Sequence, residues 1–336
     1  MTFKVGVTRD LLTVSGTPAF GERALAELSA NPAITWEWLP HEIAEITPDI
    51  AAGYDGLHIN IPRVSAASVG RDDCRVRIIA RNGVGFDSVD LEACTGRGIV
   101  VTNTPVAVRR PVAVATLTLL FALAGRLFKK NEIVRQGRWN DRTSYMGQGL
   151  TCRTLGLVGA GGVGQEIMGL ARPFFARMIA ADPWVEAGAI HRLGAEVMGL
   201  ETVMAQSDFV VVCCLLDATT RNLIDDSCFA RMKRSAYLIN VGRGPIVDER
   251  ALIRALQANR IAGAGLDVTE IEPIQPDNPL LGMENVIITP HALCWTDECF
   301  HDIAATALRS IVDVSLGQRP PHVVNPQVYE RGIERR

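Results

Sequence analysis

The chain has 336 residues, enough for two domains of ordinary size, and 48% of them are hydrophobic. Its formal net charge of -3 shows no excess of basic residues of the kind that binds nucleic acid, so we expect no nucleic-acid partner. The N-terminus lacks the apolar core of a signal peptide, and the longest apolar block, residues 111–125, is shorter than the roughly 20 residues of a membrane span. We therefore predict a cytoplasmic protein with no membrane partner.

The eight cysteines are scattered and show no paired C-x-x-C spacing of the kind that binds metal. Several of them lie in apolar runs, as small core residues do. This pattern predicts reduced thiols and no metal site.

Short strand-like and helical segments alternate through residues 1–102. Strand-like runs are predicted at residues 3–7, 56–61, 76–80 and 99–102, and a helix at residues 21–29. Such alternation favours a parallel sheet covered by helices. No phosphate-binding turn interrupts this part, so it reads as a separate α/β domain. The apolar block that follows predicts a long buried helix with Pro111 as its first residue.

A glycine-rich turn lies near the middle of the chain. Gly159, Gly161 and Gly164 have the spacing G-x-G-x-x-G, between a predicted strand at residues 154–158 and a helix that begins at Gly162. The first glycine permits a tight turn, the second lets the backbone approach a pyrophosphate, and the third lets the helix pack against its strand. The helix also directs its free N–H groups toward the phosphates. The pattern predicts a dinucleotide site.

The predicted cofactor is NAD rather than NADP. A second apolar run, residues 178–181, ends at Asp182, whose carboxylate is suited to accept hydrogen bonds from the ribose hydroxyls. The same carboxylate would repel the additional phosphate of NADP. The alternative is a purely structural turn, with Asp182 as a solvated strand end.

Four more apolar runs, at residues 209–215, 237–241, 263–268 and 286–289, suit parallel strands that are buried on both faces. Near the end of the chain, residues 302–314 form an amphipathic run. If this run returned to the first domain, the second domain would be an insertion. We thus expect an α/β fold of two doubly wound, Rossmann-like parallel-sheet domains: residues 1–102 with 295–336 for the substrate, and residues 103–294 for NAD.

An arginine, a carboxylate and a histidine follow three consecutive predicted strands. Arg243, Glu272 and His291 would meet at the carboxyl edge of one sheet, where ligands bind in such folds. Arginine can hold a carboxylate through two parallel bonds, and histidine can transfer a proton near neutral pH. Glu270 is a rival for the acidic position. Taken one at a time, each of these residues has an ordinary structural interpretation as well.

In the order and spacing of its motifs, the sequence resembles the D-isomer-specific 2-hydroxyacid dehydrogenase family over nearly its whole length. The matching segments are ARNGVGFDSVD (80–90), VTNTP (101–105), GLVGAGGVG (156–164), NVGRGPIVDE (240–249), AGLDVTEIEP (264–273) and TPHA (289–292). The resemblance implies two Rossmann-like domains, with the cofactor domain inserted. It also implies reversible hydride transfer between nicotinamide and C2 of a small 2-hydroxy or 2-keto acid.

The resemblance assigns roles to individual residues. Arg243 would bind the substrate carboxylate and carbonyl oxygen, His291 would move the hydroxyl proton, and Glu272, directly before the proline, would be the partner of His291. Val84 and Gly85 would bind the substrate carboxylate through backbone N–H groups. The implied cofactor contacts are Gly159, Gly161, Gly162, Val163, Gly164, Asp182, Cys214, Leu215, Thr220, Val241 and Asp267, the last at the nicotinamide carboxamide. The segment CCLLDATT (213–220) departs from the proline-bearing version of the family.

A further departure is the pair Arg109 and Arg110 before the long helix, whose positive N-terminus favours anions over cations. Either arginine could build an anion site, for a second acidic group of the substrate or for the cofactor phosphates. Solvated arginines or a subunit interface are the alternatives.

Substrate identity and physiological direction stay open at this point. Another interpretation is an NAD-sensing corepressor on the same fold, although we expect no long regulatory tails. An enzyme for formate or phosphite is a third possibility. Residues 111–125 and 131–139 resemble the dimerisation segment of the family, so we expect a homodimer.

Overall fold

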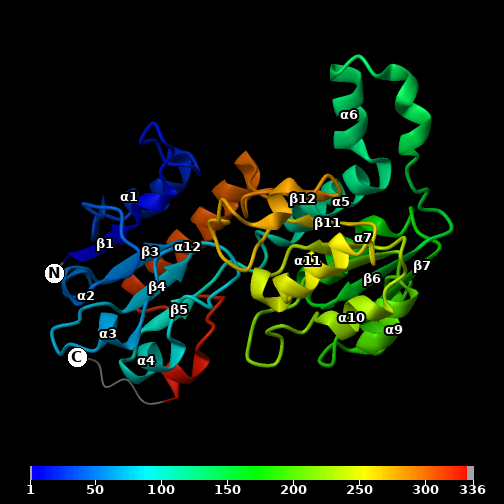
Figure 1. The fold of residues 1–336 in the computed structure, drawn as a ribbon. Coiled ribbons are helices and arrows are strands. Elements are labelled where there is room, and N and C mark those ends of the chain that lie inside the picture. Colours follow the sequence, from blue (N-terminus) through cyan, green and yellow to red (C-terminus); the bar gives the residue numbers. More distant parts are fainter. Residues whose placement is uncertain (1, 331–336) are drawn as a thin grey trace. The chain divides into compact units, whose positions relative to one another are not determined.

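The computed structural model describes residues 2–330 (Figure 1). The chain forms two compact units. One contains the chain up to Val108 together with the segment from Trp295 onward, and the other is Arg109–Cys294. The second unit is therefore inserted into the first, and both units are α/β.

The first unit is built on a five-stranded parallel sheet in the order β2-β1-β3-β4-β5. Its strands are β1 (Phe3–Val7), β2 (Ile34–Trp38), β3 (Gly56–Ile59), β4 (Ile78–Arg81) and β5 (Val100–Thr102). Its helices are α1 (Ala26–Ser29), α2 (Pro48–Gly53), α3 (Ala66–Val69), α4 (Leu91–Gly96) and α12 (Asp297–Ser315), with single 3-10 turns at Arg9–Leu11, Glu22–Leu25 and Pro326–Tyr329.

Side chains alternate between the two faces of this sheet, so each face buries its own core. On β4, Ile78 and Ala80 pack against α1 and α12, whereas Ile79 packs against α2, α3 and α4. The chain segment after α12 also joins this unit, because Val324 donates its N–H to the carbonyl of Val101 at 2.9 Å.

The second unit contains a seven-stranded parallel sheet in the order β12-β11-β10-β9-β6-β7-β8. The strands are β6 (Thr154–Val158), β7 (Arg177–Ala181), β8 (Ala195–Val197), β9 (Phe209–Val212), β10 (Tyr237–Asn240), β11 (Gly263–Leu266) and β12 (Val286–Ile288). The helices are α5 (Arg109–Gly125), α6 (Leu127–Arg135), α7 (Gly162–Ala171), α8 (Ala187–Arg192), α9 (Leu200–Gln206), α10 (Asp226–Arg231) and α11 (Glu249–Gln257), with 3-10 turns at Trp139–Tyr145, Gly244–Ile246 and Pro279–Gly282.

Helices cover both faces of the second sheet. One apolar core lies between the sheet and α5, α7 and α8, and the other lies between the sheet and α9, α10 and α11. The direction in which strands are added reverses between β6 and β9. In open parallel sheets, ligands bind outside the carboxyl ends of the strands at such a reversal. The glycine turn follows β6 directly, so it lies at this point.

Helices α5 and α6 meet at an angle of 56°, at Arg126 in a left-handed conformation. Together with the following 3-10 turn, α6 extends away from the sheet of its own unit as an arm, residues 127–145 (Figure 1). Within residues 2–330, no single helix is long and apolar enough to cross a membrane, and only α5 and α6 taken as one bent pair would reach that length and composition.

Several predicted boundaries need correction. The second unit starts at Arg109 rather than at residue 103, because Asn103 and Thr104 donate their N–H groups to His322 and Gly83 of the first unit. Helix α5 also starts at Arg109, so Pro111 is its third residue, still in the first turn where an N–H has no helical partner.

The helix predicted at residues 21–29 is a 3-10 turn followed by the single α-helical turn α1, and Pro32 follows it closely. Strands β2 and β8 were not predicted. The predicted strands after residue 200 end one to three residues early, where the chain turns into the loops that carry the candidate site.

Candidate functional site

The three glycines of the central turn meet different physical demands. Gly159 has φ +100°, and a β-carbon there would lie 2.6 Å from the backbone nitrogen of Cys214. A β-carbon on Gly164 would lie 2.5 Å from the carbonyl oxygen of Gly159. In contrast, a β-carbon on Gly161 would meet no atom within 4 Å. The turn therefore leaves open space in front of Gly161, as the approach of a pyrophosphate requires.

The N-terminus of α7 lies at this open space. Gly161 is the N-cap residue of α7, and no side chain within residues 2–330 makes a capping hydrogen bond at this helix end. The first N–H groups of the helix, from Gly162 to Gly164, therefore remain available to an anion. The donor set and the open space fit a dinucleotide with its pyrophosphate on Gly162 and Val163.

Asp182 lies directly after β7 and contacts the glycine turn. Its Oδ2 accepts the N–H of Ala160 at 2.8 Å, and its Oδ1 accepts the N–H of Trp184 at 2.9 Å. Asp182 thus ties the end of β7 to the turn, a role that the sequence analysis missed. Each carboxylate oxygen has a second lone pair, so the ribose hydroxyls still have acceptors.

The loop after β9 is held by its own polar groups. The hydroxyl of Thr220 donates to the carbonyl of Leu215 at 2.7 Å and accepts the N–H of Asp217 at 2.8 Å. Burial raises the pKa of the Cys214 thiol to about 11. Cys214 is thus a protonated, inert thiol near neutral pH, and the side chain of Leu215 is exposed.

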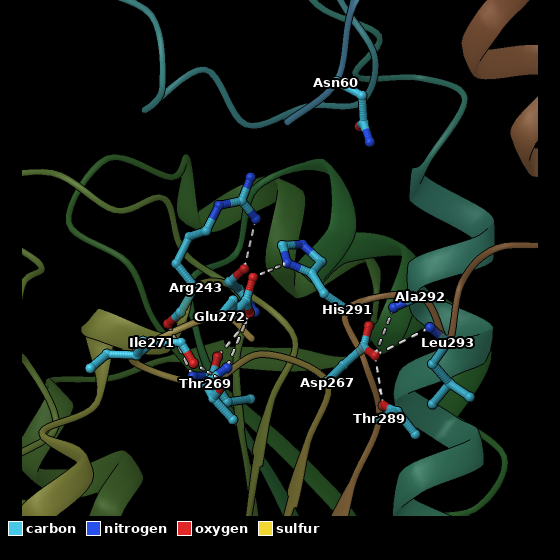
Figure 2. A network of polar contacts seen from close by, with 12 residues as sticks. Asn60, Arg243, Asp267, Thr269, Ile271, Glu272, Thr289, His291, Ala292 and Leu293 are labelled. Atoms are coloured by element: carbon cyan, nitrogen blue, oxygen red, sulfur yellow. Dashed lines mark hydrogen bonds and ion pairs between the residues drawn. The ribbon is translucent and has the colours of Figure 1, made fainter. Parts of the chain in front are cut away.

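Arg243, Glu272 and His291 follow β10, β11 and β12, three adjacent strands of the sheet. Nδ1 of His291 lies 2.8 Å from Oε2 of Glu272 (Figure 2). Oε1 of Glu272 accepts the N–H of Thr269 at 3.2 Å, which orients the carboxylate. Glu270 makes no such contact, since its N–H donates to Glu249 and its side chain is exposed. Of the two rival acids, Glu272 is the one beside the histidine.

The surroundings of Glu272 favour its ionised form. Burial alone would raise the pKa of this carboxyl, but the hydrogen bond and charge of His291, the N–H of Thr269 and the positive charge of Arg243 lower it below its ordinary value. An ionised carboxylate accepts the proton on Nδ1 of His291, which leaves Nε2 as the ring nitrogen that does not face Glu272. His291 itself has φ +54°, an uncommon conformation for a residue with a side chain.

Asp267 holds the loop that carries His291. Its Oδ1 accepts the hydroxyl of Thr289 at 2.6 Å and the N–H groups of Ala292 and Leu293, each at 3.2 Å (Figure 2). Thr289 was not singled out in the sequence. Leu266 on β11 pairs with Ile288 on β12, so Asp267 and Thr289, the residues directly after them, become neighbours through a strand register that the structure shows.

The loop of Arg243 is tightly packed. The Nδ2 of Asn240 donates to the carbonyl of Arg243 at 3.0 Å, and a β-carbon on Gly244 would lie 1.8 Å from the carbonyl oxygen of Thr269. In Figure 2 the guanidinium of Arg243 is on the same side of the sheet edge as the ring of His291. Val241, just after β10, donates its N–H to Val212 at 3.1 Å.

Val84 and Gly85 belong to the first unit, in the loop after β4. Gly83 precedes them with φ +107°, and its N–H donates to the hydroxyl of Thr104 at 3.1 Å. The side chain of Asn103 donates to the carbonyl of Val84 at 2.8 Å. In the part of the chain that the structure describes, the N–H groups of Val84 and Gly85 donate to no other residue.

The two arginines at the start of α5 have different neighbours. Nε of Arg110 lies 2.5 Å from Oε1 of Glu166 on α7, so this pair is an ion pair between two helices. Arg109 lies against the first residue of α7, since a β-carbon on Gly162 would lie 2.6 Å from its Nε.

Comparisons with known proteins agree with this architecture. Residues 117–292 match the family model "D-isomer specific 2-hydroxyacid dehydrogenase, NAD binding domain". A glyoxylate reductase of Korarchaeum cryptofilum is 38% identical over 259 residues, which cover 76% of this chain and 78% of that protein. Glyoxylate/hydroxypyruvate reductase B of Salmonella newport is 38% identical over 257 residues, covering 75% and 79%.

A solved structure of a protein from Thermus thermophilus has a TM-score of 0.83 and 32% sequence identity, and covers 96% of this chain and 100% of that one. The long shared segments, the matched NAD-binding domain and the common fold identify the cofactor as NAD and the protein as an oxidoreductase. The chain belongs to the D-isomer specific 2-hydroxyacid dehydrogenase family.

Proposed function

We propose that this NAD-dependent enzyme interconverts a small 2-keto acid and the corresponding 2-hydroxy acid, with Arg243, Glu272 and His291 as its catalytic residues. The observation that supports this proposal is the contact of 2.8 Å between Nδ1 of His291 and Oε2 of Glu272 at the carboxyl edge of the NAD-binding sheet. Such a pair is suited to general acid–base catalysis, because the carboxylate orients the imidazole through Nδ1.

In the direction of reduction, bound NADH supplies the hydride that C2 of the keto acid accepts. Negative charge then develops on the former carbonyl oxygen, and the guanidinium of Arg243 stabilises that charge. His291 donates the proton from Nε2 to this oxygen and completes the hydroxyl group. In oxidation the same nitrogen would remove the proton from the hydroxyl group, and bound NAD would accept the hydride that leaves C2.

The substrate carboxylate is assigned to Arg243 of the second unit. In the first unit, the backbone N–H groups of Val84 and Gly85 make no hydrogen bond in the described part of the chain, which leaves them available to an anion. The substrates that we propose are glyoxylate and hydroxypyruvate, because relatives named as reductases of these acids share 38% identity over three quarters of the chain.

We further propose that the enzyme is a homodimer whose two subunits contact each other through α5 and the arm. The large exposed apolar side chains on these elements are Val114, Phe121, Leu127, Phe128, Val134 and Trp139. A group of large apolar side chains on one segment is typical of a protein–protein contact. All eight cysteines are free thiols, which suits a reducing compartment, and we propose the cytoplasm.

The decisive experiment follows NADH absorbance with glyoxylate, hydroxypyruvate, pyruvate, phosphohydroxypyruvate and bulkier or dicarboxylic keto acids. We expect turnover of glyoxylate or hydroxypyruvate that is lost in His291→Gln, while NADH still binds to the variant. Tight NADH binding with no turnover of any acid would overturn the proposal and favour an NAD sensor. Turnover that survives in His291→Gln would refute the role of this residue.

A further inference from the structure

Arg109, the first residue of α5, lies over the first turn of the pyrophosphate helix α7. A β-carbon on Gly162 would lie 2.6 Å from Nε, 3.1 Å from Cζ and 3.2 Å from Cδ of Arg109. The arginine side chain thus occupies the space that any side chain at Gly162 would need. The absence of a side chain at this position lets a guanidinium approach the helix N-terminus closely.

This position is electrostatically unfavourable for a cation when no anion is present. The N-terminus of α7 carries partial positive charge, and Arg109 also stands at the N-terminus of α5. Within residues 2–330, no carboxylate forms an ion pair with Arg109. The one acid in the early part of α7, Glu166, is already paired with Arg110. No other acid of α7 can offset the charge of Arg109, and the carboxylate of Asp182 at the glycine turn already accepts the N–H groups of Ala160 and Trp184.

An anion in front of Gly161 would be attracted by all of these groups at once. The pyrophosphate of NAD carries two negative charges, and the open space at Gly161 together with the free N–H groups of α7 provides its place. A guanidinium beside that place can donate two parallel hydrogen bonds to phosphate oxygens. An anion at this place would balance the charge of Arg109, which forms no ion pair within residues 2–330.

We propose that Arg109 is a cofactor-positioning residue that binds the pyrophosphate of NAD, in addition to the N–H groups of the glycine turn. Arg110, its neighbour in sequence, has a structural role through Glu166 and does not contact the cofactor. The proposal concerns cofactor affinity and is independent of which acid the enzyme reduces, so a failure of the substrate assignment would leave it intact.

The test measures the Kd of ligands that differ in their phosphates, by fluorescence titration of the full-length protein. NADH and ADP-ribose contain the pyrophosphate, whereas adenosine contains none. Arg109→Gln should weaken the binding of NADH and ADP-ribose by about tenfold or more, because the charged hydrogen bonds to the phosphates are lost. The binding of adenosine should stay unchanged. Arg109→Lys should recover part of the affinity. Increasing salt should weaken NADH binding less steeply in Arg109→Gln than in the parent.

Arg110→Gln is the matched control, with the same charge change one residue away, and its Kd for NADH should equal that of the parent. The unfolding temperature of Arg109→Gln without cofactor should be unchanged or higher, because a repulsive cation is removed. Equal losses of affinity in both variants, an equal loss for adenosine, or unchanged NADH affinity in Arg109→Gln would each overturn the proposal. So would a lower unfolding temperature without cofactor, since Arg109 would then stabilise the turn itself.

Discussion

Nδ1 of His291 and Oε2 of Glu272 lie 2.8 Å apart, although the two residues belong to loops that follow different strands. The contact fixes which nitrogen of the ring faces the carboxylate, and leaves Nε2 as the nitrogen to which we assign proton transfer. Three hydrogen bonds to Oδ1 of Asp267 hold the histidine loop in this position. This geometry predicts that substitution of Glu272 and substitution of His291 will reduce the catalytic rate to different extents.

Replacement of His291 by Gln should lower kcat about a hundredfold or more, the usual contribution of a general acid. Glu272→Gln should also lower kcat but retain part of the activity, because the carboxylate oxygen that contacts Nδ1 of His291 and orients the ring is replaced by an amide. The measurement is kcat for the keto acid. Glu270→Gln is the control and should leave kcat unchanged; an equal loss there would contradict our choice of Glu272.

Two glycines of the same turn should respond differently to alanine. Gly164→Ala places a β-carbon 2.5 Å from the carbonyl oxygen of Gly159, so we expect a loss of stability of about 1–3 kcal/mol. Gly161→Ala meets no atom within 4 Å and should leave the unfolding temperature unchanged. It should instead weaken NADH binding about tenfold or more, because the methyl group fills the space for the pyrophosphate. Unfolding scans and NADH titrations of both variants separate the two effects, and the same response in both would show that the space at Gly161 is not a ligand site.

Asp182 should control the choice between NADH and NADPH. Asp182→Ser keeps an oxygen acceptor near the N–H groups of Ala160 and Trp184 but removes the negative charge. We expect kcat/KM to fall for NADH and to rise for NADPH, because the charge that repels the additional phosphate is gone. The ratio of the two kcat/KM values measures this change and cancels any general loss of activity. An unchanged ratio would mean that Asp182 acts only by tying β7 to the turn.

The stability of the first unit should decrease in acid because of His58. This residue is fully buried on β3, its Nε2 contacts Oδ1 of Asn82 at 3.2 Å, and burial lowers its pKa to about 4. Since an unfolded histidine has a pKa of about 6.5, the unfolded state takes up a proton between these values and the native state does not. The free energy of unfolding should therefore fall as pH decreases from about 6.5 to about 4, by no more than about 3 kcal/mol. Urea unfolding of the parent and of His58→Gln tests this, and the variant should show a weaker dependence on pH in that range; parallel curves would contradict the assignment.

The apolar arm should determine the oligomeric state. Phe128 on α6 is 59% exposed in the single chain, an unusual position for a large aromatic residue. Phe128→Glu places a charge on the surface that we assign to the subunit contact. The variant dimer should therefore dissociate at a higher protein concentration than the parent dimer. Light scattering after size-exclusion chromatography reports the mass. Trp184→Glu, at an exposed residue after β7, is the control and should not change it.

Much of the architecture was readable from local patterns. Continuous apolar runs predicted most of the parallel strands, and the glycine spacing after one of them predicted the dinucleotide turn. These features follow from neighbouring residues, because backbone conformation and burial on both faces of a sheet depend on local composition. The placement of Arg243, Glu272 and His291 at one sheet edge followed for the same reason, since parallel strands end on the same side.

Finer choices needed the tertiary structure. Glu270 and Glu272 are two residues apart and have the same chemistry, yet only Glu272 contacts His291, because the course of the loop decides where each carboxylate points. Arg109 and Arg110 are likewise distinguished only by what α7 places opposite them, a bare glycine for one and Glu166 for the other. Contacts between segments far apart in the chain set the direction of a side chain, and the spacing of residues within a motif does not contain that information.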